Sequence, residues 1–138
     1  MKIRARVENS FGVHHTTLTT NDNSHSIAIP PRESGFGSSA NGGELLFLAL
    51  ATCYCNDIYR EAAKQGIEVE RVEVEVEGQF GAAGEPARDV TYRARVVAHA
   101  TEAAIQQLMR QTDSLAEIQN TLRVPTTVTL EQIEAVTA

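Results

Sequence analysis

Two cysteines, Cys53 and Cys55, are the residues of this chain best suited to chemistry. A cysteine acts as a nucleophile only as the thiolate, and burial among apolar residues raises the pKa of the thiol. Each cysteine is therefore either a nucleophile with a cation nearby or a small buried apolar side chain. Residues two apart on a helix point in nearly opposite directions, which disfavours a disulfide between them. Two reduced thiols are expected, as in a cytoplasmic protein.

Four charged residues are candidates to act with the cysteines. Arg32 precedes the cysteine-containing segment and is the first candidate cation, with a solvated loop charge as the alternative. Arg123 is the second candidate. Glu44 could orient an arginine, or it could cap the start of its own helix. Asp57 follows Cys53 by one helical turn, where a bare carboxylate would disfavour the thiolate, so we expect Asp57 to be paired.

The sequence contains no motif that would indicate a metal or a cofactor. His14 and His15 are neighbours on an expected strand and so point to opposite faces. Together with His25 and His99 they form no recognised metal-ligand spacing. The glycines of the loop before the cysteines lack the lysine of a phosphate-binding motif. We therefore expect neither a metal site nor a cofactor.

Composition limits the class of protein. The chain has 138 residues, 42% apolar and 5% aromatic, with no Trp, so one domain over residues 1–138 with an aliphatic core is expected. The net charge of −6, with scattered Lys and Arg, disfavours nucleic acid or an anionic membrane as a partner. No apolar run is long enough to span a bilayer, and the first ten residues, MKIRARVENS, do not resemble a signal peptide.

The first half of the chain reads as a three-stranded meander followed by a helix. Strand-like alternation and β-branched residues predict strands at 2–8, 13–20 and 24–29. Pro, Gly and Ser predict a loop over 30–41. A helix is expected over 43–65, and its first part, LLFLALATCYC, is apolar all round. Such a helix is buried on every side.

The second half predicts a strand pair, a helical block and a closing strand. Alternation indicates strands at 69–80 and 90–98, a helical region over 101–121 that breaks near Asp113-Ser114, and a last strand over 124–130. Glutamates of the first strand are expected opposite arginines of the second, at positions Glu73, Glu75, Arg93 and Arg95. The order βββ-α-ββ-α-β is typical of the α+β class. One sheet covers only one face of a helix, so a partner chain is the simplest cover for the rest of the apolar helix.

The helix segment GGELLFLALATCYCND resembles the OsmC/Ohr family of osmotically inducible and organic hydroperoxide resistance proteins. The family helix has a Gly/Asn/Pro-containing cap, Glu-Leu-Leu, an Ala/Leu run, and a Cys followed four residues later by Asp. Here these are Asn41, Glu44-Leu45-Leu46, Cys53 and Asp57. The stretch NTLRVPTTVTL, residues 120–130, resembles the family's closing helix-to-strand passage. The element order matches over nearly the whole chain.

The resemblance implies an OsmC-like fold with a long buried central helix against an antiparallel sheet, in an intertwined homodimer with active sites at the interface. It also implies reduction of organic hydroperoxides through a cysteine on that helix, which becomes a sulfenic acid. In the family a second cysteine resolves the sulfenic acid, and an Arg and a Glu activate the first. Carried onto this chain, the catalytic residues are Cys53, Arg32 and Glu44.

The chain departs from the peroxidase subgroup at two positions. Ala116 stands where the family has its resolving cysteine, so an external thiol reductant is required. Gly43 stands where that subgroup has its activating glutamate. A glutamate at the position of Glu44 instead resembles an OsmC-like subgroup whose biochemical role is less settled. The alternatives therefore stay open: a thiol peroxidase, a module that binds a small apolar ligand or senses redox state through Cys53, or a stress protein without chemistry. An arginine within hydrogen-bonding reach of an accessible Cys53 would favour the first.

Overall fold

The computed structural model describes all residues from 1 to 138, in five strands and three helices. The chain forms two compact units, residues 1–46 and 47–138. The predicted α+β class is confirmed, with antiparallel sheets in both units. None of the helices combines the length and the apolar character needed to cross a lipid bilayer.

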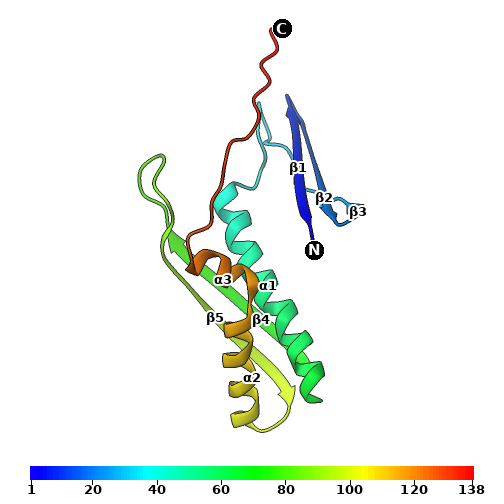
Figure 1. Ribbon diagram of the computed structural model, residues 1–138, viewed down its shortest axis with the longest axis vertical. Helices are drawn as coiled ribbons and strands as arrows, with labels where there is room; N and C mark the ends of the chain where they lie inside the picture. The colour runs from blue at the N-terminus through cyan, green and yellow to red at the C-terminus, as the bar shows by residue number, and fades with distance from the viewer. The chain divides into compact units, whose positions relative to one another are not determined.

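The first unit contains a meander of β1 (Ile3–Ser10), β2 (Val13–Thr20) and β3 (Asn23–His25), as predicted (Figure 1). A two-residue turn joins β1 to β2, and its second residue, Gly12, has a φ of 68°, which favours glycine. The third strand is shorter than the expected 24–29.

The early end of β3 has a local cause in side-chain hydrogen bonds. The Ser26 hydroxyl donates to the Thr16 carbonyl at 2.6 Å, and the Thr16 hydroxyl donates to the Ile27 carbonyl. Side-chain hydroxyls thus donate to backbone carbonyls that continued pairing of β2 with β3 would have used as acceptors. The pairing with β2 ends at His25 for this reason.

The long helix α1 (Gly42–Gln65) begins with a capping box. The Glu44 amide donates to Asn41 Oδ1 at 2.9 Å, and the Asn41 amide donates to Glu44 Oε1 at 3.1 Å. The helix is followed by Gly66, whose φ of 67° suits a glycine after a helix end. The capping alternative for Glu44 is therefore confirmed.

The second unit is built on a two-stranded antiparallel ribbon, β4 (Glu68–Gln79) and β5 (Arg88–His99). Helices α1 and α2 (Glu102–Leu115) pack on one face of this ribbon (Figure 1). The core joins α1, α2 and the inward-facing residues of both strands; its most buried members are Tyr54, Ile58, Ala62 and Leu108.

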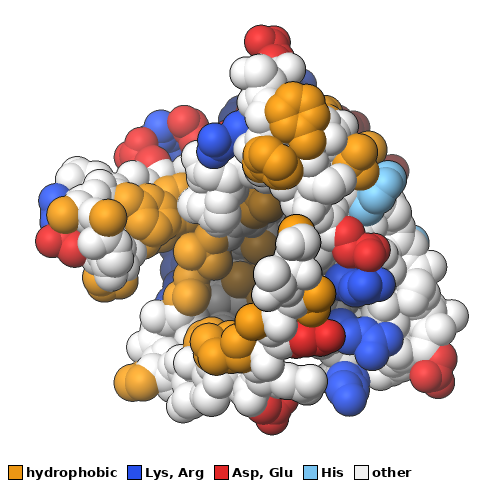
Figure 2. Space-filling view, turned by 90° about the horizontal axis from the view of Figure 1, so that it is seen from above, with side chains coloured by type: hydrophobic (Ala, Val, Ile, Leu, Met, Phe, Trp, Pro, Cys, Tyr) orange, Lys and Arg blue, Asp and Glu red, His pale blue; other side chains and the backbone are white.

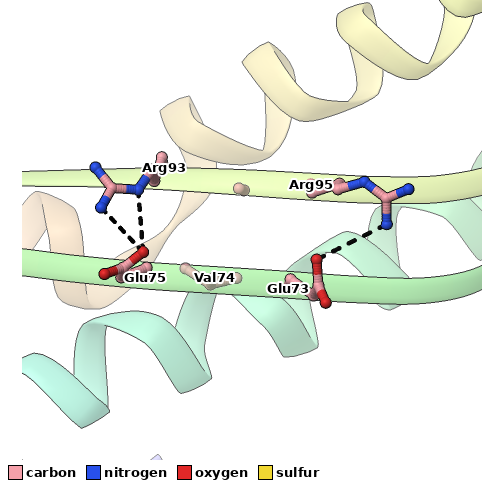
Figure 3. Close-up of a pocket in the computed structure, with 6 residues that line it drawn as sticks. Glu73, Val74, Glu75, Arg93 and Arg95 are labelled. Atoms are coloured by element: carbon pink, nitrogen blue, oxygen red, sulfur yellow. Dashed lines mark hydrogen bonds and ion pairs between the residues drawn. The ribbon is translucent and has the colours of Figure 1, made fainter.

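The opposite face of the ribbon carries cross-strand ion pairs, as predicted. Arg93 lies 3.0 Å from Glu75, and Arg95 lies 3.8 Å from Glu73 (Figure 3). A shallow hollow lies among these four side chains. All four are largely exposed, so each pair contributes at most about 1 kcal/mol. Their main effect is to favour this register of β4 against β5, because it places opposite charges across from one another.

Helix α2 is followed by a short helix, α3 (Glu117–Arg123), and the break between them lies at Ala116 rather than at Asp113-Ser114. Ala116 is extended, with φ −69° and ψ 109°, and it is fully buried. Ala116, which stands where the family has its resolving cysteine, is thus the residue that separates α2 from α3.

The prediction of a closing strand is wrong. Residues 124–130 form no strand, because their β-branched pattern has no paired neighbour, and Val128 is 93% exposed. Helix α1 is buried along the one side that the β4–β5 ribbon covers, and Leu48 is 56% exposed, so the expected cover of its other sides by a partner chain stays a prediction. Apolar side chains are accordingly conspicuous at the surface in Figure 2.

Candidate functional site

The Cys53 thiol lies in the second unit between two carboxylates. Its Sγ is 3.6 Å from Asp57 Oδ2, one turn further along α1, and 3.9 Å from Glu117 Oε2, at the first residue of α3. Cys53 is half-buried, Asp57 is buried and Glu117 is exposed. Sequence reasoning anticipated Asp57 near the thiol, but not Glu117.

Side-chain contacts hold α3 over this part of α1. The Gln119 amide donates to the Leu50 carbonyl at 2.9 Å. At the other end of α3, Arg123 lies 2.6 Å from Asp113 Oδ1, and the same carboxylate accepts from the Tyr92 hydroxyl. These contacts tie α3 to α1, α2 and β5, which places Glu117 beside the thiol.

The surroundings of Cys53 disfavour its thiolate. Burial raises the pKa of the Cys53 thiol, and the Asp57 and Glu117 carboxylates raise it further. A hydrogen bond from the Ile118 backbone amide acts in the opposite direction but does not outweigh them. At neutral pH Cys53 is therefore mainly a thiol that donates to a carboxylate.

A single guanidinium balances both carboxylates. Arg60 Nη1 lies 2.9 Å from Asp57 Oδ1 and 3.3 Å from Glu117 Oε1. Burial raises the pKa of Asp57, and Glu117 raises it too, whereas Arg60 lowers it. The pKa of Glu117 is lowered, first by its own backbone amide and then by Arg60. The prediction that Asp57 is paired is confirmed.

The Cys53 thiol and the carboxylates of Asp57 and Glu117 are also the three groups at this site that could bind a metal cation. The Cys53 sulfur and the nearest oxygens of Asp57 and Glu117 lie within 4.8 Å of one another. The guanidinium of Arg60 already contacts both carboxylates and supplies the positive charge there. We therefore assign the cluster to an ion pair with Arg60, and the expectation of no metal site stays a prediction.

The other two predicted catalytic residues, Arg32 and Glu44, belong to the first unit. The Arg32 amide donates to the Gly37 carbonyl at 3.2 Å, which pins the base of its loop, and its side chain is exposed. The Glu44 carboxylate caps α1. Their roles beside Cys53 stay predictions. The second candidate cation, Arg123, is engaged by Asp113.

Sequence reasoning missed Arg60. It follows Cys53 by seven residues and Asp57 by three, so all three share one side of a helix. That spacing was a usable signal for an arginine that could pair with Asp57. Glu117 carried no such signal, because it is 64 residues away in sequence from the thiol that it contacts.

The second cysteine lies in a different setting. Cys55 is half-buried and free, and it lines an open hollow of about 230 Å³ with Ala51, Thr52, Asn56 and Val74. Ligand pockets typically have volumes of about 300–1,000 Å³. The hollow is smaller than that and is not lined by Cys53, so Cys55 shows no feature of a reactive site.

Comparisons with solved structures show the fold of this chain. An OsmC-like protein from Mycoplasma pneumoniae is 16% identical, with a TM-score of 0.61 over 88% of this chain and 86% of that one. An organic hydroperoxide resistance protein OsmC from Legionella pneumophila, described as a predicted redox protein and regulator of sulfide bond formation, is 19% identical. Its TM-score is 0.58 over 89% of this chain and 90% of that one.

A third structure, an OsmC-like protein of unknown function from Vibrio cholerae, is 16% identical, with a TM-score of 0.59 over 88% and 93% of the two chains. No curated protein sequence is significantly similar to the chain. The family model for OsmC-like proteins matches residues 35–131, which include the whole of the Cys53 cluster. The chain therefore belongs to the OsmC-like protein family.

Proposed function

We propose that this OsmC-like protein reduces organic hydroperoxides through Cys53, with an external thiol as reductant. The observation that carries the proposal is the contact of the Cys53 thiol with Asp57 Oδ2, because it gives a half-buried thiol an adjacent proton acceptor. The name of the Legionella relative, a hydroperoxide resistance protein, supports the same substrate class.

The first step transfers one oxygen atom to sulfur. The Cys53 proton moves to Asp57, and the thiolate attacks the terminal oxygen of the hydroperoxide. An S–O bond forms, the O–O bond breaks, and the alkoxide leaves with the proton from Asp57 as an alcohol. The products are the alcohol and a sulfenic acid at Cys53. The raised pKa of Asp57 suits it to both halves of this proton transfer.

The second step returns Cys53 to the thiol at the expense of an external thiol. One thiol attacks the sulfenic sulfur, giving a mixed disulfide and water, and a second thiol then releases Cys53 and an external disulfide. The chain cannot supply the first thiol at the family position, because residue 116 is alanine. Turnover therefore depends on the reductant supplied, and the sulfenic acid is open to further oxidation.

Arg32 and Glu44 remain proposed catalytic residues on the strength of the resemblance. Glu44 already accepts from a backbone amide through Oε1, which leaves Oε2 for an arginine. Arg32 lies in a loop whose backbone is held by Asn9, since the Gly37 amide donates to Asn9 Oδ1 at 2.9 Å. A cytoplasmic location belongs to this proposal too, supported by the two free cysteines.

We also propose that the protein is a homodimer. Leu48 on α1 and Val128 and Leu130 in the last segment are exposed apolar residues in the single chain, and a partner copy would cover them. An interface of about 2,000 Å² or more is expected, with the amino-terminal strands joining a sheet with the partner's. Sedimentation at micromolar concentration should give the dimer mass, and a stable folded monomer would contradict the proposal.

The test of function is the site of first oxidation. The protein is treated with cumene hydroperoxide, trapped with a sulfenic-acid reagent and mapped by mass spectrometry. We expect the label on Cys53, and consumption of the hydroperoxide when a dithiol is supplied. If no dithiol supports consumption and Cys53 stays a free thiol, the peroxidase proposal fails. A small apolar ligand at the same site would then be the better account.

A further inference from the structure

We propose that Arg60 is a positioning residue of this site, which holds Asp57 and Glu117 together and so keeps Asp57 able to accept the proton of Cys53. The inference deepens the proposed function and rests on it for the catalytic step. It concerns the ionisation of one thiol, which can be measured without any peroxide. Arg60 acts through the carboxylates and is not itself placed against a reacting atom.

The contacts have a paired geometry. Asp57 uses Oδ1 for Arg60, at 2.9 Å, and Oδ2 for Cys53, at 3.6 Å. Glu117 likewise uses Oε1 for Arg60, at 3.3 Å, and Oε2 for Cys53, at 3.9 Å. Two carboxylates from two different helices therefore bridge the same guanidinium and the same thiol. Moving the guanidinium changes the orientation of both.

Arg60 is itself held in place. Its Nε donates to Glu61 Oε1 at 2.8 Å, and Glu61 is buried at 3% exposure beneath Arg60 and Lys64. Lys64 contacts Glu61 at 3.0 Å and makes no ion pair with Asp57 or Glu117. Glu61 thus acts as an anchor, and Arg60 is the cation shared by the two carboxylates at the thiol.

The charges around Cys53 show what Arg60 does. From α1 the thiol meets Asp57, and from α3 it meets Glu117 and the Ile118 amide, so both charged neighbours are negative. Without Arg60, the Asp57 and Glu117 carboxylates would face Cys53 with no cation, so their unbalanced charge would raise the pKa of the thiol and their mutual repulsion would turn Asp57 away from it. An Asp57 carboxylate that is turned away from Cys53 cannot receive its proton. Arg60 keeps that carboxylate oriented and its charge balanced.

The test is the rate at which iodoacetamide alkylates Cys53 as a function of pH, read by mass spectrometry of the Cys53 peptide. The full-length protein is compared with Arg60→Met and with the matched control Lys64→Met. Arg60→Met should react roughly three- to tenfold more slowly near pH 8, with its profile shifted to higher pH, because removing one paired charge shifts a pKa by about half to one unit or more. Lys64→Met should stay within about twofold of wild type, because Lys64 does not contact the thiol's carboxylates.

A second pair of variants separates charge from general damage. Glu117→Gln added to Arg60→Met should bring the rate back toward wild type, since one of the two unbalanced charges is gone. Arg60→Lys should be intermediate, because an ammonium keeps the charge but cannot span three carboxylates. Wild-type reactivity in Arg60→Met, or no recovery in the double variant, would overturn the assignment. If the shifts occur but wild type consumes no hydroperoxide, the proposed function fails and the role of Arg60 stands.

Discussion

Replacing Cys53 with serine is expected to abolish hydroperoxide consumption. A serine hydroxyl is not ionised near neutral pH and cannot take an oxygen atom to form a stable acid, so neither half of the cycle can occur. The loss should be complete within the sensitivity of the assay. The measurement is consumption of cumene hydroperoxide with a dithiol, at equal protein concentrations.

The matched control is Cys55→Ser. Cys55 lies two residues away on the same helix and lines a separate hollow, away from Asp57, Arg60 and Glu117. It should keep most of the wild-type activity. Equal losses in the two variants would contradict a role specific to Cys53. Non-reducing peptide mapping should also show no Cys53–Cys55 disulfide, because the helix separates the two sulfurs.

Replacing Ile58 with alanine should cost about 2–5 kcal/mol of unfolding free energy. Ile58 is fully buried at 0% exposure, in a core with Tyr54, Ala62 and Leu108. Its truncation removes apolar contacts and leaves a cavity where α1 meets α2 and the ribbon. Urea unfolding followed by circular dichroism of the helices gives the value, with the protein concentration held constant in case of dimerisation.

The control for that change is Ile58→Val, which removes one methylene and should cost only about 0.5–1.5 kcal/mol. Equal effects of the two substitutions would mean that the site collapses around any smaller side chain. A loss below about 1 kcal/mol in Ile58→Ala would show that this residue is not a principal core contact. In either case the packing described for the second unit would need revision.

Local patterns in the sequence determined the regular elements. Alternation predicted the strands of the meander and of the β4–β5 ribbon, and the cross-strand pairs followed from facing positions such as Glu75 and Arg93. The cap at Asn41 and Glu44 was predictable because its partners are three residues apart. The helix motif around Cys53 also indicated the family that the family model then showed.

Tertiary structure alone decided the chemical surroundings of the thiol. Glu117 reaches Cys53 because the chain turns at Ala116 and α3 is tied to Leu50 by Gln119, contacts between residues far apart in sequence. No local pattern encodes them. The prediction of a closing strand over 124–130 was wrong because it, too, depended on a tertiary neighbour. A strand needs the hydrogen bonds of a neighbour, and a β-branched pattern specifies the segment's preference but not the neighbour.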